Sequence, residues 1–294
     1  MNEKKKKETQ FYEEMSNAEY RQREGLASTD IKRMMKSMAL WKFLKDNPEE
    51  NTDTPSLKFG RAYHKFCLEP YDFENEFVVS PKIDRRTKEG KEAYEAFVKE
   101  AEGKEVIDQE MYDQLTKMRE VLYATPYVKK LLAGEHEKSM FWVDKKTGIK
   151  CKCRADSFGV FGNINVIVDL KTVSDAETTA FMRDAMKFGY DIQAAHYLEG
   201  IQTVTGKEYK FVFVAQEKSA PYLCNVLEAD EFFIRNGYEV RDELLKTYLK
   251  CLELNEYPAY MGFASEKKVA NELTVPAWIR NAMGEEQGYA DEND

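Results

Sequence analysis

The segment RADSFGVFGNINVIVDLK, residues 154–171, decides the fold of this chain. Its second half, 166–171, is a β-branched apolar run that ends in an acid and a base, as in a buried strand with a polar end. Because side chains alternate between the faces of a strand, Asp169 and Lys171 share one face. Asp156 ends the preceding strand, which as a neighbour in the sheet would bring its carboxylate beside Asp169. The segment therefore predicts a sheet that gathers two carboxylates and one ammonium group.

Two aspartates and a lysine in this pattern suit the hydrolysis of a phosphodiester. Carboxylate oxygens and a backbone carbonyl, here that of Leu170, are ligands that Mg²⁺ prefers, and the ion keeps other positions for water and phosphate. Such an ion activates water and neutralises charge that grows on phosphorus, while Lys171 would orient the attacking water. A surface Asp/Lys pair on an amphipathic strand is the alternative. Asp169 directly follows an apolar run, which favours a functional acid.

The chain resembles the PD-(D/E)xK nuclease superfamily, and within it the RecB-like and RecE-like exonucleases of the exonuclease VIII type. The spacing of Asp156, Asp169 and Lys171 matches the catalytic core of that superfamily, although Val168 stands where its name has proline. Other matches follow the order of the family and extend the likeness over roughly residues 28–257. They are GRAYH at 60–64, similar to a G-x-x-x-H helix; QAAHY at 193–197, similar to a Q-x3-Y motif; and 31–79 with 84–87, similar to a RecE-type N-terminal portion.

The resemblance implies further site residues. His64 would reach a metal or its water, although a hydrogen-bonded packing histidine is the alternative. Gln193 and Tyr197 lie one helical turn apart and would brace the site, whereas we expect His196 to be structural. Glu137 precedes the first strand of the sheet and would complete the metal shell through water, or else be a solvated glutamate. The candidate catalytic residues are Asp156, Asp169, Lys171, Gln193 and Tyr197, and the candidate metal ligands are His64, Glu137, Asp156, Asp169 and the backbone carbonyl of Leu170.

Basic residues outside this core are candidates for contacts with DNA phosphates, which position DNA without reading its sequence. The resemblance favours such contacts for Arg85, Arg86 and Lys88, which lie in a loop before a predicted helix. Lys150 and Lys152 alternate along a strand, and for them we expect the solvent face.

The resemblance implies an α/β fold with a restriction-endonuclease-like core, in which helices flank a central mixed sheet behind a helical N-terminal portion. We expect residues 28–262 to form a single nuclease domain, mainly helical over 28–132 and with the sheet core and flanking helices over 133–262. There the hydrophobic period changes from about 3.6 to about 2. Residues 1–27 are expected to be a flexible basic arm, and 263–294 a C-terminal segment with an acidic tail. Single helices are predicted over 28–46 and 109–132.

Composition and charge limit the classes of protein to which the chain can belong. The chain has 294 residues, of which 43% are hydrophobic and 33% charged, so it is not disordered as a whole. A net charge of −9 argues weakly against a nucleic-acid partner. Residues 281–294, however, carry five acids and no base, so removing them changes the charge from −9 to −4. The chain has no membrane-length apolar run and no signal-like start, which predicts no membrane partner and a cytoplasmic location.

The pattern of cysteines and glycines limits which cofactors we expect. The five cysteines form no C-x-x-C pair, so reduced thiols are expected. Iron–sulphur relatives carry a C-terminal cluster of three cysteines, whereas here Cys251 alone follows Cys224, which predicts no Fe–S cluster. The chain has no glycine-rich phosphate loop, so we expect no ATP. The expected cofactor is Mg²⁺, which Mn²⁺ can replace.

The sequence thus predicts a Mg²⁺-dependent exodeoxyribonuclease, a hydrolase acting on ester bonds. The resemblance implies a RecE-like 5′–3′ exonuclease on double-stranded DNA in phage or bacterial recombination, acting as a homo-oligomer beside a RecT-like annealing protein. One alternative is a structure-specific or restriction-like endonuclease on the same core. Another is a catalytically silent DNA-binding or assembly module, which the intact Asp156, Asp169 and Lys171 disfavour.

Overall fold

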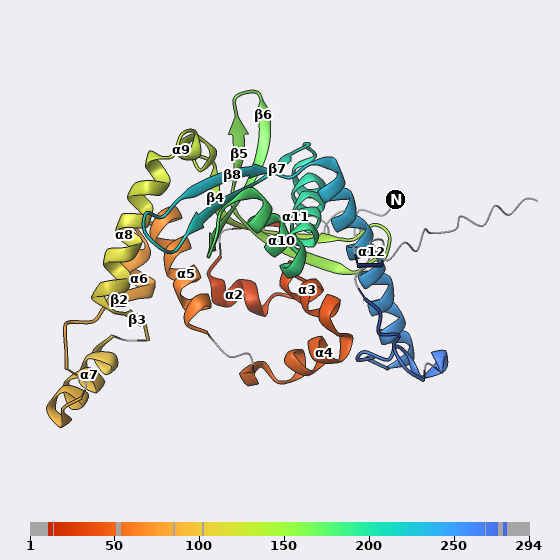
Figure 1. Cartoon of the computed structure of the whole chain (residues 1–294), viewed down its shortest axis with the longest axis horizontal. Coiled ribbons are helices and arrows are strands. Elements are labelled where there is room, and N and C mark those ends of the chain that lie inside the picture. Colours follow the sequence, from red (N-terminus) through yellow and green to blue (C-terminus); the bar gives the residue numbers. More distant parts are fainter. Residues whose placement is uncertain are drawn as a thin grey trace, which may run out of the picture.

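A six-stranded mixed sheet forms the centre of the computed structural model (Figure 1). The strand order is β1-β4-β5-β6-β7-β8, and β6 and β7 are parallel while the other neighbours are antiparallel. This mixed sheet between helices confirms the predicted fold class. The structure describes residues 11–13, 15–50, 54–84, 86–101, 103–267, 269–275 and 279–280. The strands of the sheet are β1 (Phe11–Glu13), β4 (Glu135–Val143), β5 (Lys150–Phe161), β6 (Ile164–Val173), β7 (Lys210–Glu217) and β8 (Cys224–Glu228).

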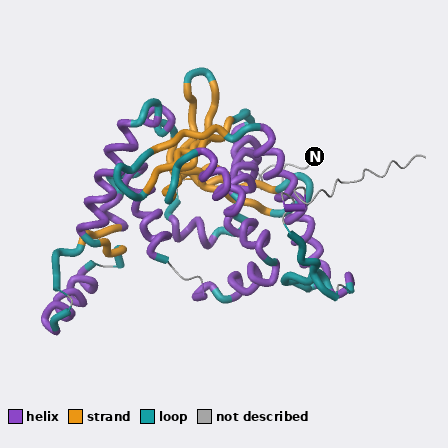
Figure 2. The backbone as a smooth tube through the Cα atoms, in the orientation of Figure 1, coloured by secondary structure: helices purple, strands orange, loops and turns teal. Residues whose placement is uncertain are grey.

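Helices cover both faces of the sheet, and a small parallel pair of strands lies apart from it (Figure 2). No helix within the described ranges is long and apolar enough to cross a membrane. The remaining elements are α2 (Asn17–Gln22), α3 (Ser28–Lys36), α4 (Met38–Asp46), η1 (Pro48–Glu50), α5 (Pro55–Leu68), α6 (Phe73–Glu76), β2 (Phe77–Val79), α7 (Lys88–Glu100), β3 (Glu105–Ile107), α8 (Gln109–Ala124), α9 (Val128–Leu131), α10 (Thr178–Phe188), α11 (Tyr190–Thr205), α12 (Glu231–Leu254) and η2 (Ala264–Glu266).

Strand β6 separates two of the three hydrophobic clusters found among the described residues. Val166, Val168 and Leu170 pack on one face, in the core that α5 and α8 complete. Ile167 packs on the other face, in the core beneath α10 and α11. The predicted alternation of side chains along this strand is confirmed, and it places Asp169 on the same face as Ile167.

Two helices predicted as continuous are broken. The expected helix over 28–46 is divided into α3 and α4 at Ser37, whose backbone is extended and whose hydroxyl accepts a hydrogen bond from the Leu40 N–H at 3.1 Å. The expected helix over 109–132 ends at Ala124. Pro126 follows, and a residue before proline avoids helical geometry, so Thr125 is extended.

The N-terminal segment, predicted to be a flexible arm over residues 1–27, contains a strand and a helix within its described residues. Residues 1–10 lie outside the described residues, but 11–27 contain β1, which pairs with β4, and helix α2. Lys152 holds this segment, because its ammonium donates to the carbonyls of Tyr20 at 2.9 Å and Arg23 at 2.6 Å. Lys152 is only 6% exposed, so the expected solvent face was wrong for this residue. The carbonyls at the end of a helix attract a cation.

A buried polar network joins α11 to α12. Arg241 donates to His196 Nδ1 at 3.2 Å and to Asp144 at 2.8 Å, and His196 Nε2 contacts the Lys152 carbonyl at 3.1 Å. Burial, together with the charge of Arg241, lowers the pKa of His196 to about 3. The histidine is therefore neutral and holds the packing together.

We expect His196 to make the protein less stable in mild acid. The unfolded histidine takes up a proton below its ordinary pKa of about 6.5, whereas the folded one stays neutral until about pH 3. Lowering the pH from 7.5 to 5.5 should therefore cost about 1.4 kcal/mol of unfolding free energy through this group. Urea unfolding of the wild type and His196→Gln should show the two curves converging as the pH falls. A difference that does not change with pH would contradict this account.

Candidate active site

The candidate site lies where β5 and β6 separate. Their ladder ends at the pair Ser157 and Val168. Beyond it, the Leu170 N–H donates to Asp156 Oδ2 at 2.7 Å, so a side chain replaces the missing backbone acceptor. This bond holds the Asp156 carboxylate against the end of β6 that carries Asp169.

One group of possible metal ligands lies where β5 and β6 separate, a place called the split below. This acid–histidine cluster consists of His64, Glu137 and Asp156. These residues come from α5, β4 and β5, and one ligand atom of each lies within 4.8 Å of the others. His64 Nδ1 is 3.4 Å from Asp156 Oδ1. Glu137 has a φ of 50° and is missing from the ladder between His136 and Lys138. A left-handed backbone is rare outside glycine, and such strain is typical of functional sites.

The charges in the acid–histidine cluster are coupled. Burial, together with the Asp156 carboxylate, raises the pKa of Glu137 to about 8. Burial opposes the charge of His64, but the carboxylate of Asp156 outweighs it and raises the pKa of His64 to about 9. The charge of His64 likewise outweighs burial and keeps the pKa of Asp156 below its ordinary value. At neutral pH the cluster thus combines an imidazolium, a carboxylate and a protonated glutamic acid.

A second group is the lysine–glutamine cluster, which consists of Lys32, Asp169, Lys171 and Gln193. Asp169 is 1% exposed, and its Oδ1 accepts a hydrogen bond from Gln193 Nε2. Its Oδ2 lies 2.5 Å from Lys171 Nζ. Gln193 Oε1 lies 2.9 Å from Lys32 Nζ and 3.5 Å from Lys171 Nζ. One amide thus connects two ammonium groups to one carboxylate.

The sequence placed Asp169 among the metal ligands with His64 and Asp156, and this assignment stays a prediction. Among the described residues, the side chains close enough together to hold a metal ion are those of His64, Glu137 and Asp156. Burial and the charge of Asp156 raise the pKa of Asp169, so the two aspartates do interact. Asp169 Oδ2 is buried, and its partner among the described residues is the Lys171 ammonium.

The donor set fits a hard divalent cation. Three carboxylates and one imidazole lie where β5 and β6 separate, and carboxylate oxygens are the donors that such a cation prefers. Leu170 enters the site through its N–H, so coordination by its carbonyl stays a prediction.

Comparisons with known proteins agree with this geometry. Residues 27–268 match a family model described as "PDDEXK-like domain of unknown function (DUF3799)". The chain belongs to this family. Its membership confirms the predicted resemblance to the PD-(D/E)xK superfamily, while the RecE type stays a prediction.

A solved structure supports the fold. A crystal structure from Eubacterium rectale, described as a "Putative exonuclease", is 15% identical, covers 92% of this chain and 99% of its own, and has a TM-score of 0.61. At this identity the likeness shows a shared fold. The structure of SSO0001 is 16% identical and covers 64% of this chain and 86% of its own. Its TM-score of 0.28 is too low to indicate a shared fold. No curated protein matches the chain.

Tyr197 lies on α11, one turn after Gln193. Its ring is 6.3 Å from the ring of Phe211 and packs against the core beneath that helix. Burial raises its pKa well above the ordinary value, so the phenol stays neutral. This packing is compatible with bracing of the site, and a direct role stays a prediction.

The candidate DNA contacts lie on a different part of the molecule. Arg86 is 91% exposed and pairs with Asp84 at 2.9 Å. Lys88 is 84% exposed and lies 3.8 Å from Glu92. It begins α7, which stands off from the sheet in Figure 1, so the structure does not bring these cations to the acid–histidine cluster. Arg85 lies outside the described residues. Phosphate contacts by all three stay predictions.

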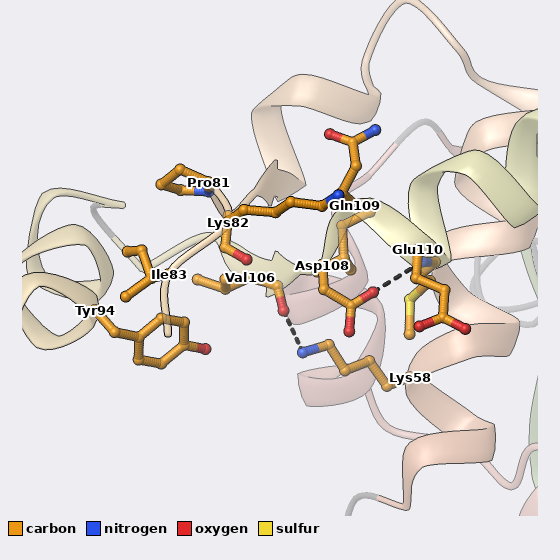
Figure 3. A pocket seen from close by; sticks show the side chains of 12 residues that line it. Lys58, Pro81, Lys82, Ile83, Tyr94, Val106, Asp108, Gln109 and Glu110 are labelled. Carbon is orange, nitrogen blue, oxygen red and sulfur yellow. Dashed lines mark hydrogen bonds between the residues drawn. The ribbon is translucent and has the colours of Figure 1, made fainter. Parts of the chain in front are cut away.

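A pocket of about 390 Å³ lies between α5, α7, α8 and the small sheet (Figure 3). Lys58 donates to the Val106 carbonyl at its floor, and Asp108 Oδ1 accepts from the Met111 N–H at 2.8 Å. The pocket contains no member of either cluster, so it is separate from the candidate site.

Two residues of the site gave no signal in the sequence. Lys32 comes from α3, 161 positions before Gln193, and nothing in its own helix marks it as functional. Tyr190 follows Gly189, and its ring lies 5.5 Å from Lys32 Nζ and 4.9 Å from Lys171 Nζ. Burial, with the charge of Lys171, lowers the pKa of Lys32 to about 8. Contacts formed only in the folded chain reveal both residues.

Glu137 should destabilise the metal-free protein as the pH rises. The unfolded glutamate loses its proton near pH 4.5, whereas the folded one keeps it until about pH 8. The folded state therefore binds more protons in this range, and stability falls with increasing pH. Urea unfolding in the presence of a chelator at pH 5, 6.5 and 8 should show Glu137→Gln gaining stability relative to the wild type. Glu135→Gln, an exposed change on the same strand, should show no such trend.

Proposed function

We propose that the protein is a metal-dependent deoxyribonuclease that hydrolyses phosphodiester bonds in DNA. The observation that carries the proposal is the meeting of the acid–histidine and lysine–glutamine clusters where β5 and β6 separate. Membership of a PDDEXK-like family supports it. The description of the neighbour from Eubacterium rectale as a "Putative exonuclease" supports an exonuclease over an endonuclease.

The acid–histidine cluster would hold the divalent cation, with His64, Glu137 and Asp156 as ligands and Asp169 Oδ2 facing it. Such a cation would activate a water and offset charge on the phosphate. We assign Mg²⁺, because most of these donors are carboxylates, and the imidazole makes Mn²⁺ an effective substitute.

Lys171 would act as a hydrogen-bond donor. Burial alone would lower its pKa, but the Asp169 carboxylate outweighs burial and raises it. The side chain is therefore an ammonium at neutral pH, with three donors and no lone pair. It would orient the attacking water or hold a phosphate oxygen, and it would not accept the proton of the water. Gln193 and Tyr197 would keep the surrounding side chains in place.

The finer proposal is a RecE-like 5′–3′ exonuclease that degrades double-stranded DNA in phage or bacterial recombination. The GRAYH and QAAHY motifs support it through their resemblance to that family. The same resemblance supports a homo-oligomer, a RecT-like annealing partner and a cytoplasmic location. A restriction-like endonuclease and a catalytically silent module are the competing functions, and DNA substrates of different topology distinguish them.

Nuclease assays should show release of nucleotides from linear duplex DNA with Mg²⁺ or Mn²⁺, while closed circular duplex stays intact. Lys171→Ala and Asp169→Asn should each lower the rate by about 100-fold or more. The first removes an ammonium group beside the reacting phosphate, and the second removes an anionic charge that would help to hold the cation. A label at the 5′ end should be released before one at the 3′ end.

Lys210→Ala provides the matched control, because this lysine on the neighbouring strand is exposed and pairs with Glu228. Its rate should equal that of the wild type. Cleavage of closed circles would establish an endonuclease instead. A wild-type protein without activity in either metal would favour the silent module.

Metal binding should release protons. At pH 7 both Glu137 and His64 are protonated, with pKa values of about 8 and about 9, and both must lose their protons to bind a cation. Calorimetry with Mn²⁺ in buffers of different ionisation enthalpy should detect about two protons released per cation. The apparent affinity should rise from pH 6 to pH 8.5.

Glu137→Gln should reduce the proton release by about one, since a glutamine has no proton to lose. The exposed change Glu95→Gln on α7 should leave it unchanged. An affinity that does not depend on pH would contradict binding at the acid–histidine cluster.

A further inference from the structure

Lys32 reaches the candidate site from the helical N-terminal portion of the chain. Its Nζ donates to Gln193 Oε1 at 2.9 Å, which is shorter than the 3.5 Å between the same oxygen and Lys171 Nζ. Lys171 is also bound to Asp169, so its ammonium is shared. Lys32 is therefore the principal donor to this amide oxygen.

The charges around Gln193 leave its amide a single orientation. The ammonium groups of Lys32 and Lys171 are donors only, so the carbonyl oxygen of the amide must face them. The ionised carboxylate of Asp169 is an acceptor only, so the NH₂ group must face it. A flipped amide would place its NH₂ against two cations and its oxygen against the carboxylate. Lys32, Lys171 and Asp169 thus fix the amide together, and Lys32 makes the shorter of the two contacts with its oxygen.

The surrounding backbone leaves a passage for the lysine. A Cβ added to Gly189 would lie 3.2 Å from Lys32 Cγ, so the glycine gives the side chain its path past the start of α11. The ring of Tyr190 lies beside both ammonium groups. The base of the lysine is fixed because its neighbour Ile31 is fully buried. Gly189, Tyr190 and Ile31 thus together restrict the position of the Lys32 ammonium group.

We propose that Lys32 is a positioning residue of the nuclease. It holds Gln193 so that the amide donates to Asp169, and Asp169 in turn holds Lys171. This inference rests on the proposed function, and it adds a residue of the N-terminal helices to the reaction. Lys32 acts through Gln193, so its removal should affect turnover and leave DNA binding unchanged.

Steady-state kinetics with Mn²⁺ test this chain of contacts. Lys32→Met keeps the apolar stem and removes the donor, and it should lower kcat by about tenfold or more while KM for DNA changes little. Lys32→Arg retains a cationic donor and should recover most of the rate. Lys36→Met removes an exposed lysine from the same helix and should match the wild type.

A double-mutant cycle tests the dependence on Gln193. In a Gln193→Ala background, Lys32→Met should cause no further loss, because the residue through which it acts is gone. Additive losses would overturn the proposal, and so would a higher KM at unchanged kcat, which would make Lys32 a DNA contact. A normal rate for Lys32→Met would overturn it as well.

The side-chain amide of Gln193 offers a readout that needs no activity. In protein labelled with ¹⁵N-glutamine, the NH₂ signal that disappears in Gln193→Ala identifies this group. Its protons should exchange slowly in the wild type and Lys32→Arg, and at least about tenfold faster in Lys32→Met, because hydrogen bonding protects them. An unchanged exchange rate would overturn the inference. A protein without nuclease activity that still shows the faster exchange would refute the proposed function and keep the assigned contact.

Discussion

The separation of β5 from β6 is the constraint on which the site depends. Strands that diverge leave backbone donors without acceptors, and a buried unpaired N–H is costly. Here the Asp156 carboxylate accepts the Leu170 N–H, so the gap in the sheet selects a charged side chain. That charge in turn favours the imidazolium of His64 and the proton of Glu137. One interruption in a ladder thereby organises the acid–histidine cluster.

Local charge at the site is opposite to the charge of the whole chain. The chain carries −9, whereas the acid–histidine cluster balances one carboxylate with one imidazolium at neutral pH. The lysine–glutamine cluster holds two ammonium groups and the single carboxylate of Asp169: Lys171 pairs with this carboxylate, and Lys32 donates to Gln193. The split is thus an electropositive point on an acidic protein, and such a point attracts a phosphate.

The sequence predicted those features of the fold and of the site that depend on local periodicity and on motifs. The alternation along β6 and the approach of Asp156 to the end of that strand followed from strand geometry, and the class of fold followed from the resemblance. It did not predict that Lys32 would join Gln193, Lys171 and Asp169 in one hydrogen-bonded cluster. The role of Lys152 was also missed, because the helix end that it binds comes from a distant segment. Contacts between residues that are far apart in the chain form only through tertiary packing, so no periodic pattern in the sequence indicates them.

The pairing of β1 with β4 has a consequence for solubility. An uncovered strand at the border of a sheet offers a row of free amides to any other strand, and self-association follows from it. The short strand Phe11–Glu13 occupies that border, and the contacts of Lys152 keep the following helix in place. A shortened chain that begins after this strand would present β4 as a template for intermolecular sheets. This border of the sheet is thus a strand of three residues, and short edge strands limit edge-to-edge association.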